Sequence, residues 1–163
     1  MILNETYTLE NGLSIPKLGL GTWFIDDDQA AEAVRTAVKL GYRLIDTAQA
    51  YGNERGVGEV RVIGVSNFLR DDLENLLSDC RVKPMVNQIL LHISNTDLAL
   101  LDYCREQGIQ MEAYSPIAHG VALKNPAIAE MAKKYGINAA QLCIRYVIEL
   151  GAVALPKTAN PDH

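Results

Sequence analysis

The sequence lacks the usual features of membrane-spanning, secreted and nucleic-acid-binding proteins. No uncharged stretch approaches the roughly 18–20 residues that a transmembrane helix needs. The first residues have neither a basic region nor the long apolar run of a signal peptide. Lys and Arg number 15 against 20 Asp and Glu, a net charge of −5. We therefore expect no nucleic acid or membrane partner.

Cysteine is also scarce. Cys80, Cys104 and Cys143 are far apart, odd in number and not in a C-x-x-C spacing. This pattern predicts reduced core thiols, no metal site and a cytoplasmic location. The length of 163 residues allows one domain with a substantial core.

Apolar strand-like runs alternate with segments of helical spacing. The predicted strands cover residues 18–23, 42–47, 61–66, 85–91, 110–115 and 152–155. The predicted helices cover residues 29–40, 71–78 and 97–107, with two more starting near residues 126 and 139, and residues 53–60 begin a helix that stays incomplete. This alternation predicts a parallel α/β protein.

Capping and turn residues support these boundaries. Asn11-Gly12 is a hairpin turn pair between short apolar segments. Asn125 followed by proline is a helix start, and Asn138 with Gln141 has capping-box spacing. The predicted helix stops are glycines 41, 136 and 151.

Residues with useful chemistry recur where predicted strands end. They are Trp23, Asp46, Ser66, Asn67, Gln88, Tyr114, Ser115 and Lys157. A (β/α)8 barrel places its active site at these ends. A doubly wound sheet also uses strand ends, but its phosphate-binding loop needs G-x-G-x-x-G, and LGLGTW supplies only G-x-G.

Six motifs follow one another in an order typical of one family. They are GLGTW (19–23), GYRLIDTAQAYGNE (41–54), IGVSNF (63–68), VNQI (86–89), AYSP (113–116) and LPKT (155–158). In these motifs the chain resembles the aldo-keto reductases over nearly its whole length. The resemblance implies an α/β fold, a (β/α)8 TIM barrel with an N-terminal hairpin, with NADP(H) bound across the strand ends. Residues 1–163 would form one incomplete barrel domain of this kind.

The resemblance also implies a catalytic set of Asp, Tyr, Lys and His, of which Asp46 and Tyr51 match the first two. Hydride delivery to a carbonyl leaves an alkoxide, so a proton donor must lie within hydrogen-bonding reach. A phenol is a poor donor at neutral pH unless a neighbouring ammonium lowers its pKa. Outside the motif, Asp46 would be interpreted as a helix cap and Tyr51 as a loop anchor.

The cofactor-binding residues implied by the resemblance fall in the other motifs. Ser66, Asn67 and Gln88 match positions that hydrogen-bond the nicotinamide carboxamide, and Tyr114 matches the ring that stacks on the nicotinamide. Lys157 matches the cation that pairs with the 2′-phosphate. The motifs add further cofactor residues: Gly21, Thr22, Ser115 and Thr158.

For several residues a structural role is a simpler alternative to the functional one. Trp23 matches a wall of the substrate pocket but could equally be packing, Tyr114 could be a core aromatic, and Asn87 with Gln88 a satisfied polar pair. His92 and His119 do not fall at the family's catalytic histidine, and we interpret both as loop residues.

The chain departs from the family pattern between Val60 and Arg61. A typical barrel has about 250 residues, and the third and fourth strands, with the catalytic Lys and His, should lie at this joint. The last helix and loop of the family also lie beyond His163. Either this sequence omits residues that the natural polypeptide contains, which we favour, or the shorter chain is complete and has negligible activity.

The main hypothesis is therefore a reductase that transfers hydride from NADPH to an aldehyde or ketone, with a small-molecule carbonyl as its partner. The alternative is a catalytically inactive, NADP-binding barrel that acts as a regulatory or interaction subunit. We expect a monomer.

Overall fold

The computed structural model describes residues 2–22, 25, 27–46, 64–80 and 83–157. The expected helix at 53–60 and the joint between Val60 and Arg61 lie outside the described residues. None of the described helices is long and apolar enough to cross a membrane.

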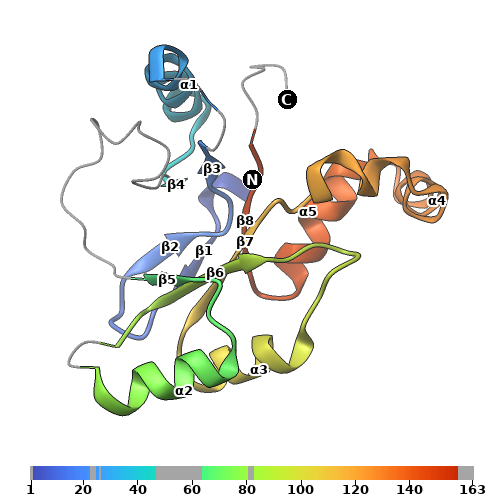
Figure 1. Ribbon diagram of the computed structural model, residues 1–163. Helices are drawn as coiled ribbons and strands as arrows, with labels where there is room; N and C mark the ends of the chain where they lie inside the picture. The colour runs from blue at the N-terminus through green and yellow to red at the C-terminus, as the bar shows by residue number, and fades with distance from the viewer. Residues whose placement is uncertain (1, 23–24, 26, 47–63, 81–82, 158–163) are drawn as a thin grey trace.

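Parallel strands form the centre of the molecule (Figure 1). Four of them pair in the order β5-β6-β7-β8; their bounds are Gly64–Ser66, Val86–Leu90, Gln110–Tyr114 and Val153–Leu155. β3 (Leu20–Gly21) pairs in parallel with β4 (Ile45–Asp46). A parallel bridge between Leu18 and Ala154 joins the two groups. The described strands thus follow one another as β5-β6-β7-β8-β3-β4, an open arc of a parallel barrel.

Helices occupy the connections between these strands. They are α1 (Asp27–Leu40), α2 (Arg70–Asp79), α3 (Leu98–Glu106), α4 (Pro126–Lys134) and α5 (Ala139–Glu149), with short 3-10 turns η1 (Ile2–Asn4), η3 (Ala118–Gly120) and η4 (Ala122–Lys124). All six predicted strands and all five predicted helices are present. β3 and β4 are shorter than expected, at two residues each.

Side-chain caps explain where two of the helices begin; the cap of α5 was predicted, whereas that of α3 was not. Asp97 accepts a hydrogen bond from Leu100 N (2.9 Å) at the start of α3. Asn138 and Gln141 bond each other's backbone N–H in the expected capping box of α5. These side chains satisfy N–H groups that have no partner within the helix.

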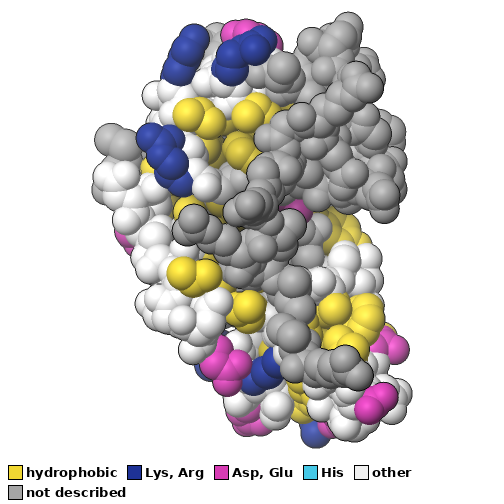
Figure 2. Space-filling view, turned by 90° about the vertical axis from the view of Figure 1, so that its left-hand side faces the viewer, with side chains coloured by type: hydrophobic (Ala, Val, Ile, Leu, Met, Phe, Trp, Pro, Cys, Tyr) yellow, Lys and Arg dark blue, Asp and Glu magenta, His cyan; other side chains and the backbone are white. Residues whose placement is uncertain are grey.

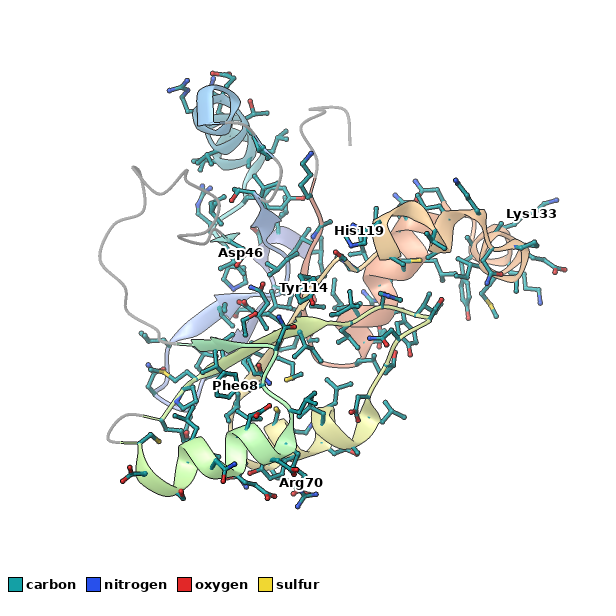
Figure 3. All side chains as sticks on the ribbon, in the orientation of Figure 1. Asp46, Phe68, Arg70, Tyr114, His119 and Lys133 are labelled. Atoms are coloured by element: carbon teal, nitrogen blue, oxygen red, sulfur yellow. The ribbon has the colours of Figure 1, made fainter. Side chains whose placement is uncertain are left out.

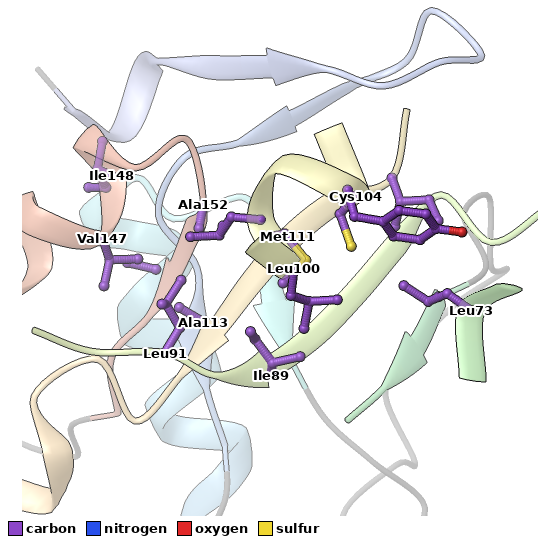
Figure 4. Packing of buried hydrophobic residues seen from close by; sticks show 14 of the residues in the cluster. Leu73, Ile89, Leu91, Leu100, Cys104, Met111, Ala113, Val147, Ile148 and Ala152 are labelled. Atoms are coloured by element: carbon purple, nitrogen blue, oxygen red, sulfur yellow. The ribbon is translucent and has the colours of Figure 1, made fainter. Parts of the chain in front are cut away.

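The main core lies between the sheet and the helices (Figure 4). Because side chains alternate across a strand, Ile89 and Met111 face α3 and α5, together with Leu91 and Ala113. They pack on Leu100, Cys104 and Val147. The intervening residues of the same strands, Gln88 and Glu112, therefore face the barrel interior.

An N-terminal hairpin closes one end of the interior. β1 (Thr6–Thr8) and β2 (Ser14–Pro16) are antiparallel around the predicted turn, where Gly12 has a φ of 81°. Leu9, just after β1, and Ile15 of β2 pack on Val86 and Val153, the first residues of β6 and β8. The opposite end, where the strands terminate, remains accessible.

Candidate functional site

A pocket of about 470 Å³ opens at the carboxyl ends of the strands. Figure 3 shows Asp46, Tyr114 and His119 grouped there, whereas Arg70 on α2 and Lys133 on α4 lie on the periphery. The lining residues are Gly21, Asp46, Ser66, Asn67, Gln88, Tyr114, Ser115, Pro116, Ile117, His119, Leu155 and Lys157. Segments far apart in sequence therefore meet at one site, because parallel strands all end on the same side of the sheet.

Most of the residues predicted from the motifs line this pocket. Gly21, Asp46, Ser66, Asn67, Gln88, Tyr114, Ser115 and Lys157 are among them. Thr22 is not; its buried hydroxyl donates to the backbone oxygen of Asp46 (2.8 Å) and joins the ends of β3 and β4. Trp23, Tyr51 and Thr158 lie outside the described residues.

Asp46 ends β4 with its side chain directed across the barrel interior. Its Oδ1 accepts a hydrogen bond from Gln88 Nε2 at 2.7 Å, although the two residues are 42 positions apart. Burial raises the pKa of the Asp46 carboxyl, and the hydrogen bond from Gln88 opposes that rise. Among the described side chains, no Lys or Arg forms an ion pair with Asp46.

Gln88 lies in the middle of β6, rather than at its end as the sequence predicted. Its register neighbours are Ser66 on β5 and Glu112 on β7. The neighbouring Asn87 faces the helices and donates to Phe68 O (2.8 Å). The two amides therefore have separate roles: Asn87 fixes the loop after β5, and Gln88 reaches the pocket.

Glu112 is a buried carboxyl that the sequence analysis missed. Only 8% of the residue is exposed, and its Oε2 accepts from Gln88 Nε2 at 3.2 Å. Burial raises its pKa to about 7; the Gln88 hydrogen bond lowers it and the charge of Asp46 raises it. A charged residue at an inward position of a predicted strand was the signal available in the sequence.

Two residues just past the strand ends have a left-handed backbone. They are Asn67 after β5 (φ 59°) and Ser115 after β7 (φ 51°). Non-glycine residues rarely adopt this conformation, and it concentrates at functional sites. The sharp change of direction holds both residues in the pocket wall. Tyr114 Oη donates to Asn67 Oδ1 (3.1 Å) and so links the ends of β7 and β5, on either side of β6.

His119 also reaches the pocket, from the turn η3. From the sequence alone we expect His119 to be a loop residue, because it does not match the catalytic histidine of the family. Its Nε2 lies 3.2 Å from Ser115 Oγ. Pro116, Ile117 and Leu155 complete the wall and were likewise not predicted as site residues.

The residues that line the pocket fit nicotinamide adenine dinucleotide phosphate, NADP(H). Ser66, Asn67 and Gln88 offer polar groups for a carboxamide, and Tyr114 offers an aromatic face. The exposed Lys157 offers a cation for a phosphate. In the described part of the chain, no three His, Cys, Asp or Glu residues are arranged to hold a metal.

Comparisons with known proteins agree with this site. The model of the "Aldo/keto reductase family" matches residues 17–59 and 56–163. Glyoxal reductase of Bacillus subtilis is 31% identical over 229 aligned positions that cover 96% of this chain and 83% of the relative. The 9,11-endoperoxide prostaglandin H2 reductase of Trypanosoma cruzi is also 31% identical over 229 positions, covering 94% and 81%.

Solved structures give the same result. The crystal structure of a mutant of Gox0644 in complex with NADPH superposes with a TM-score of 0.90, at 27% identity, over 97% of this chain and 84% of that one. An aldo/keto reductase from Brucella melitensis superposes with a TM-score of 0.87 at 29% identity, over 97% and 90%.

The alignments also locate the missing part of the barrel. Those with the two named relatives are longer than the 163 residues of this chain, so the relatives carry residues without a counterpart here. The family model matches in two parts that meet at residues 56–59, close to the predicted joint. The order of the parallel strands, the pocket at their ends and these matches together show that the chain belongs to the aldo-keto reductase family, whose (β/α)8 barrel it shares in part.

Proposed function

We propose that this chain belongs to a reductase that uses NADPH to convert aldehydes or ketones to alcohols. The observation that carries the proposal is the convergence on one pocket of eight residues expected at the site, which lie on or just after six different strands. The NADPH complex of a structural neighbour supports the cofactor assignment, and the glyoxal reductase among the relatives supports a small carbonyl substrate.

In this proposal the described residues orient the cofactor. Ser66, Asn67 and Gln88 bind the nicotinamide carboxamide, Tyr114 supports one face of the ring and Lys157 neutralises the 2′-phosphate. Bound NADPH supplies the hydride. Fixing the ring by both stacking and polar contacts presents one face to the substrate, and such orientation is a large part of catalysis of hydride transfer.

The proton step is assigned to Tyr51, which lies outside the described residues. The phenol donates its proton to the carbonyl oxygen as the hydride arrives at the carbonyl carbon. A lysine held by Asp46 would assist by lowering the pKa of the phenol. In the described part of the chain Asp46 instead accepts from Gln88. We assign that lysine to the stretch in which the two named relatives align over more positions than this chain has.

The same observation favours a second function. Asp46 is bonded to Gln88 and, among the described side chains, has no lysine partner, which is what a barrel that binds NADP(H) without turnover would show. Such a protein would act as a regulatory or interaction subunit.

Replacement of Tyr51 by phenylalanine separates the two functions. We expect the chain to bind NADPH in a fluorescence titration, and any oxidation of NADPH with glyoxal to fall about 100-fold or more in Tyr51→Phe, the usual contribution of a general acid. NADPH affinity should be unchanged. The matched control is Tyr135→Phe, since Tyr135 is 69% exposed and lies at the end of α4. Binding without turnover by the longer natural polypeptide would instead support the second function.

A further inference from the structure

Gln88 lies between two carboxylates in the barrel interior. Its Nε2 donates to Asp46 Oδ1 (2.7 Å) and to Glu112 Oε2 (3.2 Å). A primary amide has two N–H donors and one carbonyl acceptor. Both donors are thus engaged, and the group that remains for a ligand is the carbonyl oxygen, Oε1.

The two carboxylates also decide which way the amide points. When ionised, both groups only accept hydrogen bonds, so at a pH above the Glu112 pKa of about 7 the reversed amide would place Oε1 against two acceptors and lose both contacts. Since burying an unsatisfied polar group costs free energy, the reversed orientation is disfavoured. Glu112 and Asp46 act together here, from opposite sides of the interior.

We propose that Glu112 is a positioning residue that turns the Gln88 carbonyl oxygen toward the carboxamide NH2 of the nicotinamide. The inference rests on the proposed function, because it assumes that Gln88 meets the nicotinamide. Glu112 touches neither cofactor nor substrate in this arrangement. By fixing the orientation of the Gln88 amide, Glu112 makes Gln88 present a hydrogen-bond acceptor, and not a donor, to the ligand.

The burial of Glu112 supports a specific role. An ionisable carboxyl is expensive to bury, and an apolar side chain at this inward position would pack with Val153, its register neighbour on β8. The described contacts of the Glu112 carboxyl show one hydrogen-bond partner, the Gln88 amide. Its side chain is therefore placed to act through Gln88.

The test compares three ligands that differ in the nicotinamide. They are NADP+, its 3-acetylpyridine analogue, in which a methyl group replaces the carboxamide NH2, and 2′,5′-ADP, which lacks the ring. Dissociation constants are measured by calorimetry for the unsubstituted chain and for Glu112→Leu, Glu112→Gln and Gln88→Leu. Glu112→Gln is the conservative variant, because its Oε1 can still accept from Gln88.

We expect Glu112→Leu to weaken NADP+ binding about five-fold, the loss of one hydrogen bond of about 1 kcal/mol. Binding of the acetylpyridine analogue and of 2′,5′-ADP should not change. Glu112→Gln should restore NADP+ affinity to within about two-fold, and Glu112→Leu should add nothing in a Gln88→Leu background. If Glu112→Leu fails to fold by circular dichroism, Glu112→Asp, which shortens the side chain and keeps its charge, should show the same ligand pattern.

Equal weakening for all three ligands, or no weakening for NADP+, would overturn the role of Glu112. A different result, no binding of NADP+ by the unsubstituted chain, would overturn the proposed function and this inference with it. The unsubstituted chain thus distinguishes the two failures.

Discussion

At the scale of single residues, the interior of the barrel is where this protein departs from a simple apolar core. Asp46, Gln88 and Glu112 form one hydrogen-bonded group across it. The two carboxyls both have a raised pKa, and in each case burial is the main cause. An amide between them satisfies both with a single nitrogen, which is why two acidic groups can occupy one small region.

The raised pKa of Glu112 predicts a pH-dependent stability. The carboxyl has a pKa of about 7 in the folded chain against 4.5 ordinarily, so between these values the folded state binds more protons than the unfolded state. The free energy of unfolding should therefore fall as pH rises from about 4.5 to about 7, by about 3 kcal/mol at most, and stay low above that. Denaturant unfolding at pH 5 and pH 8 measures this.

Glu112→Gln provides the reference for that measurement. Titrating groups other than Asp46 contribute equally to both proteins, so the difference in unfolding free energy between the variant and the unsubstituted chain isolates Glu112 together with its interaction with Asp46. We expect the unfolding free energy of the variant, relative to that of the unsubstituted chain, to be higher at pH 8 than at pH 5. A constant difference between the two pH values would contradict the assignment.

At the scale of elements, helix boundaries follow local chemistry closely. The Asn138–Gln141 capping box begins α5, and Gly151, with a φ of 83°, follows its end. α5 then supplies Val147 to the main core and Cys143 to a smaller cluster with Ile128 of α4. The position of its first turn therefore determines which side chains reach the sheet.

Removal of this cap should lower stability without changing the site. Asn138→Ala leaves the N–H of Gln141 without its 2.9 Å acceptor, which typically costs about 1 kcal/mol. We expect a lower thermal midpoint by circular dichroism and unchanged NADPH affinity. Asn138→Ser, which keeps a side-chain acceptor, is the matched control, and its thermal midpoint should fall much less. Equal losses in the two variants would show that the cap itself contributes little.

At the scale of the whole molecule, the strands form an arc with two ends. In the described part of the chain, β4 and β5 each pair with one strand only. On the face in Figure 2, charged side chains of both signs lie at the two ends of the described surface, with hydrophobic side chains exposed between them. Unpaired strands and exposed apolar surface favour association with other chains. A closed family barrel would cover both.

The natural polypeptide should accordingly be heavier than this chain. The relatives align over 229 positions, and the family model breaks at residues 56–59. We expect an intact mass, measured on the protein from its natural host, well above 17.9 kDa. A mass of 17.9 kDa would mean that the barrel is open, and we would then expect no reduction of glyoxal.

The sequence by itself determined the order of strands and helices, the caps and the motif residues that line the pocket. These follow from short-range rules: periodicity, capping and turn preferences act over a few residues, and the six motifs are contiguous. Gly41, Asn125 and Asn138 have the roles predicted for them because nothing distant competes with a local hydrogen bond or a left-handed turn.

Only the tertiary structure decided how the site is connected. Gln88 was predicted at a strand end as a cofactor ligand, but it lies mid-strand and bonds Asp46, 42 residues away, and Glu112. His119 matched no motif and yet reaches Ser115 in the pocket wall. The register of parallel strands brings these groups together, and that register depends on burial of both faces of the sheet, which no local stretch of sequence records.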